Sequence, residues 1–314
     1  MRSRSRLTLA TAVTASLLLT ACSDTGGGDG EGPLAGADLT IGSKSFAESI
    51  ILGHMTMLAL ENAGANVEDQ TGIESSANVR TALTSGDIDL YWEYTGTGWI
   101  TYLGETEPIA DPQQQFDAVA EADLEENGVA WLARSPINNA YALAASTETA
   151  QDLGLSSMSD LTALLQDNPE ALTLCVESEF AARDDGLPGV LETYDLQDLP
   201  DGNISTVGEA IIYTELRDGG TCNVGEVFAT DARIAAFDLT VLEDDRSFFP
   251  IYNASPTVRA ETDEEYPEIA EILTPIAEAL DNETMAELNA QVDIEGRSAD
   301  DVAEEWLTDQ GFLD

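Results

Sequence analysis

Lys44 is the only lysine in a chain of 314 residues that carries 60 aspartates and glutamates. It lies in a short segment, residues 41–46, that reads IGSKSF. A lysine ammonium is a compact point charge that can hold a carboxylate or a phosphate. A lysine retained in so acidic a sequence is therefore a candidate ligand-binding residue. The alternative is a solvated surface side chain.

The composition is that of a globular and strongly acidic protein. Hydrophobic residues make up 43% of the chain, and the net charge at pH 7 is −48. A mass of 33.4 kDa is enough for two packed lobes. The acidic residues are scattered, so the surface lacks the basic patch that nucleic-acid binding needs. Such a surface with almost no lysine predicts adaptation to high salt, where a Debye length of about 3 Å screens the repulsion. The alternative is an acidic secreted protein at ordinary salt.

The first residues follow the pattern of a lipoprotein signal peptide. Arg2, Arg4 and Arg6 precede an apolar run over residues 7–19, which is too short to span a membrane. Residues 19–22 (LTAC) match the lipobox at which bacterial lipoproteins are cleaved, and Cys22 would then carry the lipid. We therefore predict a signal peptide over residues 1–21, a flexible tether over 22–37 and an anchor on the outer face of the membrane.

Two cysteines remain, Cys175 and Cys222, and each borders an apolar run. In an extracytoplasmic protein they can pair if their strands share a sheet. The sequence leaves open a disulfide or two buried thiols. A metal site is not expected, because the single histidine, His54, falls within a helical pattern of apolar residues.

Strands and helices alternate along the chain after the tether. Apolar spacing predicts strands at residues 39–41, 88–92, 129–132, 141–144, 171–176 and 224–228, and helices at 48–63, 77–85, 111–127, 207–217 and within 264–307. This alternation is typical of α/β lobes in which helices cover mainly parallel sheets. We place lobe 1 at residues 38–136 and 237–314, and lobe 2 at 137–236. The chain would then cross between the lobes twice, near residues 135–141 and 228–237, which makes a hinge with the ligand cleft beside it.

Four stretches of the sequence resemble one family of binding proteins. They are residues 41–48 (IGSKSFAE), 85–97 (SGDIDLYWEYTGT), 138–143 (NNAYAL), and 228–231 together with 248–253 (FATD and FFPIYN). In this order they resemble the extracytoplasmic solute-binding proteins of ABC importers for glycine betaine, choline and related quaternary ammonium compounds. The resemblance covers nearly all of residues 39–314. It implies the two-lobed type II periplasmic-binding-protein fold, no cofactor, no catalysis, and a permease subunit as partner.

The ligand of that family lies in an aromatic box between the lobes. The resemblance assigns the box to Tyr94, Tyr141, Phe228 and Tyr252, with Asn139 beside it. A quaternary ammonium group has no N–H to donate, and aromatic faces hold it by cation–π attraction worth about 0.5–2 kcal/mol per ring. The family often has tyrosine at the position of Phe228, so this chain keeps the ring there and lacks the hydroxyl.

A ligand such as glycine betaine also carries a carboxylate. The resemblance puts Lys44 and Arg183 at this end of the cleft, with Thr97 as a neutral donor; the alternative for Arg183 is an ion pair with Asp184 or Asp185. Two cations on one carboxylate would favour a betaine over choline. The expected ligand is glycine betaine or a similar solute taken up for osmoprotection, with choline, carnitine and ectoine as alternatives.

Two other classes of function are disfavoured. An enzyme with this fold would need a nucleophile and a base, and no histidine lies near the candidate motifs. A sensory module would normally continue into a membrane or signalling region, and none follows in the sequence. We therefore expect a monomeric, lipid-anchored binding protein that delivers a small ligand to a permease and binds no nucleic acid.

Overall fold

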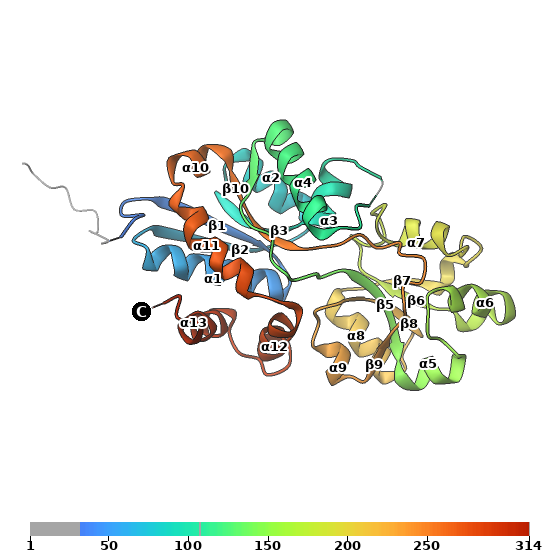
Figure 1. Cartoon of the computed structure of the whole chain (residues 1–314). Helices are drawn as coiled ribbons and strands as arrows, with labels where there is room; N and C mark the ends of the chain where they lie inside the picture. The colour runs from blue at the N-terminus through green and yellow to red at the C-terminus, as the bar shows by residue number, and fades with distance from the viewer. Residues whose placement is uncertain (1–31, 107, 314) are drawn as a thin grey trace, which may run out of the picture.

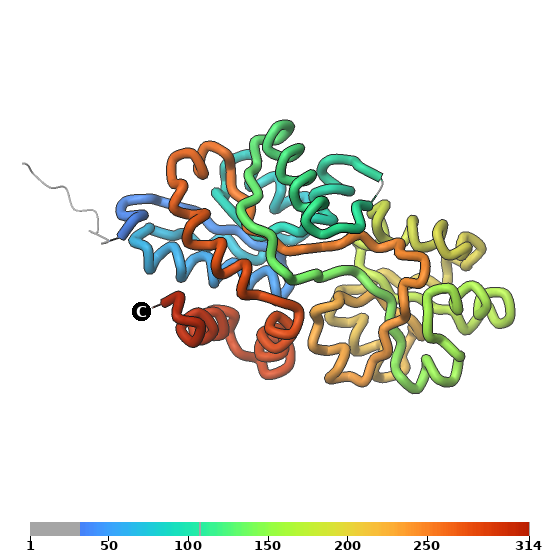
Figure 2. The backbone as a smooth tube through the Cα atoms, in the orientation of Figure 1, coloured from blue at the N-terminus to red at the C-terminus, as the bar shows by residue number. Residues whose placement is uncertain are grey.

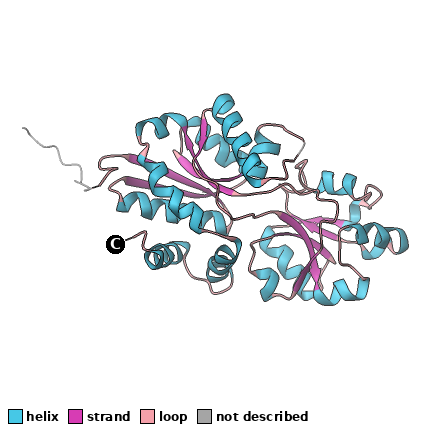
Figure 3. Cartoon of the chain, in the orientation of Figure 1, coloured by secondary structure: helices cyan, strands magenta, loops and turns pink. Residues whose placement is uncertain are grey.

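The computed structural model describes residues 32–106 and 108–313, which form two α/β lobes joined by two chain segments (Figure 1). Each lobe contains a five-stranded sheet flanked by helices (Figure 3). The predicted signal peptide, the lipobox with Cys22 and most of the predicted tether lie outside the described residues. Within the described residues, none of the helices combines the length and hydrophobicity that a membrane span requires.

The sheet of the first lobe has the strand order β2-β1-β3-β10-β4. Its strands are β1 (Asp38–Lys44), β2 (Asn66–Ile73), β3 (Leu90–Tyr94), β4 (Val129–Trp131) and β10 (Ala254–Arg259). β1 is parallel to β2 and β3, whereas β10 lies antiparallel between β3 and β4. The last strand in the chain therefore sits inside the first sheet and ties the two ends of the sequence together.

The helices of the first lobe come from both ends of the chain. They are α1 (Ala47–Asn62), α2 (Ser76–Ser85), α3 (Thr95–Thr97), the π-helical turn η1 (Gly98–Tyr102), α4 (Pro112–Asn127), α10 (Ala260–Glu265), α11 (Glu268–Ala279), α12 (Asn282–Asp293) and α13 (Ala299–Gln310). α1 packs against β1 and β2 and also against α12 and α13. Because it is covered on opposite sides, α1 is apolar around much of its circumference instead of along a single stripe.

Local sequence signals set the ends of several helices. The Asp111 carboxylate accepts hydrogen bonds from the backbone N–H groups of Gln113 and Gln114, and Pro112 occupies the first turn of α4. Gly128 ends the helix with a φ of +65°, a conformation that glycine adopts without strain. These signals explain why the predicted helix at residues 111–127 matches α4 almost to the residue.

The sheet of the second lobe has the strand order β7-β6-β8-β5-β9. Its strands are β5 (Tyr141–Ser146), β6 (Leu174–Val176), β7 (Ile204–Thr206), β8 (Val224–Phe228) and β9 (Leu239–Val241). Around it lie α5 (Thr147–Leu153), α6 (Ser159–Asp167), η2 (Pro169–Ala171), α7 (Leu187–Thr193), η3 (Asp201–Asn203), α8 (Glu209–Asp218) and α9 (Arg233–Ala236). β6 is parallel to β7 and β8, and β5 is antiparallel to β8 and β9.

Three sequence-based expectations about this architecture are wrong. The sheets are mixed, because β10 in one lobe and β5 in the other run against their neighbours. β9 pairs with β5, so the second lobe continues past residue 236. Leu34 and Ala37, expected in the flexible tether, are each 1% exposed and pack into the first lobe. The polar edge strand β2 and the returning strand β10 were not predicted, since neither shows a clear alternating pattern.

The two lobes are connected by segments that run side by side (Figure 2). The outward segment contains Asn138 and Asn139, and the return segment contains Tyr252 and Asn253. The N–H of Asn139 donates to the carbonyl of Tyr252 at 3.1 Å, and the N–H of Tyr252 donates to Oδ1 of Asn138 at 2.7 Å. The return crossing therefore lies near Tyr252, later than the predicted 228–237, because the chain first adds β9 to the second sheet.

Cys175 on β6 and Cys222, just before β8, form a disulfide whose Cα atoms lie 5.6 Å apart. β6 and β8 are parallel neighbours, so the bond joins adjacent parts of one sheet. Both residues are almost fully buried. Of the two alternatives left open by the sequence, the structure has the bridge.

Candidate functional site: the cleft between the lobes

A cleft of about 760 Å³ lies between the lobes, beside the paired connections. All eight ligand-binding residues predicted from the sequence line it: Lys44, Tyr94, Thr97, Asn139, Tyr141, Arg183, Phe228 and Tyr252. They come from β1, the end of β3, α3, both connections, the start of β5, the end of β8 and a loop of the second lobe. The fold therefore brings together residues that are far apart in the chain. Lys44 and Tyr252, the first and the last of the eight, are separated by 208 positions.

Aromatic rings form one wall of the cleft, which we call the aromatic wall: Phe46, Tyr94, Tyr141, Phe228 and Tyr252. Tyr141 and Phe228 are directly paired across β5 and β8, with ring centroids 5.1 Å apart. The Tyr252 ring meets Tyr141 edge-on at 5.5 Å. Each strand partner holds the other's ring in place, as cross-strand aromatic pairs do.

Phe46 belongs to the aromatic wall although it was not predicted as a site residue. It precedes α1 in the first lobe, and its ring lies 6.0 Å from Tyr94 and stacks on Phe228 at 5.7 Å. Phe228 belongs to the second lobe, so this stack joins the two lobes. The residue lies in the segment at 41–48 that carries the family resemblance, which was the only signal that could have found it.

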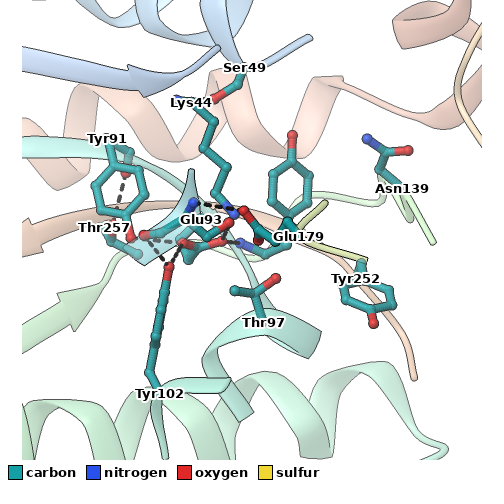
Figure 4. Close-up of polar contacts among 12 residues, drawn as sticks. Lys44, Ser49, Tyr91, Glu93, Thr97, Tyr102, Asn139, Glu179, Tyr252 and Thr257 are labelled. Atoms are coloured by element: carbon teal, nitrogen blue, oxygen red, sulfur yellow. Dashed lines mark hydrogen bonds and ion pairs between the residues drawn. The ribbon is translucent and has the colours of Figure 1, made fainter. Parts of the chain in front are cut away.

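Lys44 forms an ion pair with Glu93, with Nζ 2.7 Å from Oε1. The Glu93 side chain is fully buried and also accepts hydrogen bonds from the hydroxyls of Tyr91 and Tyr102, at 2.7 and 2.8 Å, and from the N–H of Tyr94 (Figure 4). Four donors on one carboxylate satisfy the charge that burial would otherwise destabilise. Lys44 is thus the counter-ion of a buried glutamate, in addition to lining the cleft.

Arg183 is also paired inside the protein. Its guanidinium makes a two-pronged contact with Asp185, at 2.7 and 2.5 Å, and Nη1 donates to Glu179 at 3.0 Å. Nη2 reaches Oγ1 of Thr97 across the cleft at 3.3 Å. The hydroxyl of Tyr252 donates to the same Asp185 at 2.7 Å. The alternative reading of Arg183, an ion pair with a neighbouring aspartate, therefore describes the structure, with Asp185 as the partner.

Glu48 is another buried carboxylate, only 2% exposed, and it lies directly behind the cleft-lining residues Tyr94 and Asn139. It accepts hydrogen bonds from the Tyr94 hydroxyl at 2.7 Å, the Thr230 hydroxyl at 2.6 Å and the amide of Asn139 at 3.1 Å. The Asn289 amide is a fourth donor. Burial raises the pKa of Glu48, and these four hydrogen bonds oppose the rise. The Glu48 carboxylate therefore joins the first lobe, the second lobe and the outward connecting segment through hydrogen bonds to one side chain.

Glu226 is a further buried carboxyl group, and it lines the floor of the cleft. It lies two positions before Phe228 on β8 and accepts a hydrogen bond from the N–H of Glu177 at 2.8 Å. Burial, followed by the nearby carboxylates of Glu177 and Glu209, raises the pKa of Glu226 to about 8, against the hydrogen bond of the Glu177 N–H. At neutral pH the group is therefore largely uncharged, which limits the negative charge of the cleft floor.

The first prediction concerns the Lys44–Glu93 pair. Lys44→Met removes the cation that is paired with the fully buried carboxylate of Glu93, so we expect the free energy of unfolding to fall by about 3 kcal/mol. Lys44→Met combined with Glu93→Gln removes both charges and should regain most of that loss. Urea unfolding of the single and double variants measures the coupling. Strictly additive losses would contradict this coupling. Arg217→Gln, which breaks an exposed pair with Asp218, is the control and should change the stability far less, because water screens an exposed ion pair.

The second prediction concerns pH. The pKa of Glu226 is about 8 in the folded protein and 4.5 as its ordinary value. The contribution of this group to stability is present below pH 4.5 and is lost as the pH rises through 8, because the unfolded chain ionises more readily. Glu226→Gln should therefore become more stable than the original protein as the pH rises from 5 to 8, by roughly 3 kcal/mol. Chemical unfolding across this range measures the difference. A difference that stays constant across this pH range would refute the assignment.

Comparisons with known proteins agree with this architecture. Residues 37–309 match the family described as the substrate binding domain of ABC-type glycine betaine transport systems. The chain is 38% identical to the glycine-betaine-binding protein of Pseudomonas aeruginosa, over 88% of this chain and 89% of that protein. It is 31% identical to the glycine betaine-binding protein YehZ of Escherichia coli, over 88% and 92% of the two chains.

Solved structures place the fold in the same group. A crystal structure described as a glycine betaine/carnitine/choline ABC transporter is 28% identical, with a TM-score of 0.69, and the match covers 88% of this chain and 99% of that one. The solved structures that this chain resembles have the two-lobed type II periplasmic-binding-protein fold. Members of this family are extracytoplasmic solute-binding proteins that work with permease subunits, and are not enzymes. The protein belongs to the family of substrate-binding domains of ABC-type glycine betaine transport systems.

Proposed function

We propose that this protein captures a quaternary ammonium compound, glycine betaine or a close analogue, in the cleft between its lobes and passes it to a permease for osmoprotective uptake. The observation that carries the proposal is the aromatic wall, which presents rings from both lobes to one cleft. Relatives named for glycine betaine binding support it. Choline, carnitine and ectoine are the alternative ligands for the same architecture.

The aromatic wall suits a methylated ammonium group. Such a group offers no N–H, so the carboxylates of the cleft gain no hydrogen bond from it. Ring faces attract the charge and also cover the methyl groups, which both contribute to binding. The ring hydroxyls of Tyr94 and Tyr252 are held by Glu48 and Asp185, so these two rings are fixed in orientation before any ligand arrives. A wall held in place in this way loses little entropy on binding.

When the lobes close, residues of both lobes would contact the ligand at the same time. Phe46, Tyr94 and Thr97 come from the first lobe, and Tyr141 and Phe228 from the second. A ligand that touches both sets stabilises the closed arrangement and shifts the population toward it. The permease would then recognise the closed pair of lobes.

The setting of the protein completes the proposal. Cys22, outside the described residues, would carry a lipid that anchors a monomeric binding protein to the outer face of the cell membrane. The net charge of −48 suits a cell that lives in high salt, where a solute scavenger of this type protects against osmotic stress.

The third prediction tests the aromatic wall. Tyr141→Ala and Tyr252→Ala should each weaken both glycine betaine and choline by about tenfold or more, since each removes a ring worth about 0.5–2 kcal/mol together with its apolar contact. Calorimetric titration in molar salt measures both affinities. Tyr141→Phe, which keeps the ring, is the matched control and should bind nearly as the original protein does. Unchanged binding by both alanine variants would show that the ligand lies elsewhere.

The fourth prediction uses the tight contact beneath the Tyr252 ring. A Cβ placed on Gly96 would lie 2.6 Å from two carbon atoms of that ring and 3.0 Å from the carbonyl oxygen of Ile251. Gly96→Ala should therefore displace the ring and weaken ligand binding by about tenfold or more. Gly98→Ala is the control: its Cβ would meet Trp131 at 2.7 Å, away from the cleft, so it should lower stability and leave the affinity of the folded protein unchanged. Equal affinity losses in the two variants would contradict this assignment.

A further inference from the structure

Two cationic side chains and one backbone N–H group meet at one corner of the cleft. They are the ammonium of Lys44, the guanidinium of Arg183 and the backbone N–H of Ser76 in the first turn of α2. The N-terminus of a helix carries partial positive charge, and α2 has 10 residues. We call this the anion corner. A ligand carboxylate would find its best electrostatic partners here.

A carboxylate of the protein already occupies the anion corner. Oε1 of Glu179 accepts from Nη1 of Arg183 at 3.0 Å, and Oε2 accepts from the N–H of Ser76 at 3.0 Å. Figure 4 shows Glu179 beside the Lys44–Glu93 pair. Although burial acts to raise it, the pKa of Glu179 lies below its ordinary value because Lys44, Ser76 and Arg183 stabilise the ionised form. The side chain is 27% exposed, so it faces the cleft and is not sealed in the core.

Negative charge already exceeds positive charge at the anion corner. Lys44 is paired with Glu93, and Arg183 is paired with Asp185, before Glu179 is added. Two cations thus face three carboxylates. A ligand carboxylate entering the corner would have to displace Glu179 or lie against it, and either costs binding free energy. A cation without a carboxylate meets no such opposition.

We propose that Glu179 is a specificity-determining residue: its carboxylate fills the anion corner and disfavours quaternary ammonium ligands that bring a carboxylate, relative to those, such as choline, that bring none. The inference rests on the proposed function, in which the aromatic wall holds the quaternary ammonium group. The two positions are adjacent, since Lys44 lies 5.2 Å from the ring centre of Tyr94 and Arg183 lies 5.6 Å from that of Tyr141. A short zwitterion bound at the aromatic wall therefore presents its carboxylate to Glu179.

A purely mechanical role for Glu179 makes a different prediction. Glu179 belongs to the second lobe and Ser76 to the first, so their hydrogen bond also holds the lobes together. If that were its whole contribution, its loss would weaken every ligand by the same factor. The ratio of the dissociation constants for glycine betaine and choline separates the specificity role from the mechanical role. A change in lobe closure alters both dissociation constants by the same factor and therefore leaves their ratio unchanged.

The experiment is calorimetric titration of the purified protein with glycine betaine and with choline in molar salt. Glu179→Gln removes the charge and keeps a carbonyl oxygen that can accept from Ser76. The affinity for glycine betaine should rise by about tenfold relative to that for choline, because a direct contact is little screened at this salt concentration. Glu179→Ala should shift the ratio in the same direction. Thermal unfolding of each variant shows that the protein titrated is folded, and either variant suffices.

Glu74→Gln is the matched control. Glu74 is exposed, lines the same cleft and contacts Ser45 instead of either cation. Its neutralisation should leave the ratio within about twofold of the original value, because molar salt screens an exposed charge.

The outcomes separate this inference from the proposed function. An unchanged ratio in Glu179→Gln, a shift toward choline, or an equal shift in Glu74→Gln would overturn the role of Glu179 while leaving the aromatic wall intact. Failure of the original protein to bind either ligand would overturn the proposed function, and this inference with it.

Discussion

Buried carboxylates are the constraint on which the cleft depends. A carboxylate removed from water is tolerated only with several donors around it, and those donors must be held in position. Glu93 collects Lys44, two tyrosine hydroxyls and a backbone N–H, and Glu48 collects four donors from four separate segments. Each group therefore fixes side chains of distant origin around one point. The walls of the cleft are rigid because releasing any partner would leave a charge uncompensated.

In this arrangement the aromatic rings and the charged side chains have different roles. The rings face the cleft, while the hydroxyls of Tyr94 and Tyr252 are occupied by carboxylates behind them. The two cations that line the cleft are each occupied by carboxylates of the protein. The balance of charge at the binding site is thus set by contacts of about 3 Å. The net charge of the whole surface acts over longer distances, which salt screens.

Several contacts at or beside the cleft couple the two lobes, and one of them is the hydrogen bond from the N–H of Ser76 to Glu179. Phe46 stacks on Phe228, Thr97 contacts Arg183, and Thr230 donates to Glu48. The paired connections with Asn138 and Tyr252 lie next to these contacts, so a change at the hinge alters the spacing of the ring walls directly. The disulfide joins neighbouring parts of the second sheet only, which leaves movement between the lobes unconstrained by it.

The sequence alone determined a large part of this description. Local signals, such as Asp111 and Gly128 at the ends of α4, define elements because they act within a few residues. The eight predicted ligand residues all line the cleft, since motif and chain order carry over from related proteins. Tertiary structure decided the rest. Strand direction in β10, membership of β9 in the second sheet, and the partners of Lys44 and Arg183 depend on segments far apart in the chain. A side chain's charge is visible in the sequence, but the charge that faces it, as Glu179 faces Arg183 and the start of α2, is fixed only when the two lobes come together.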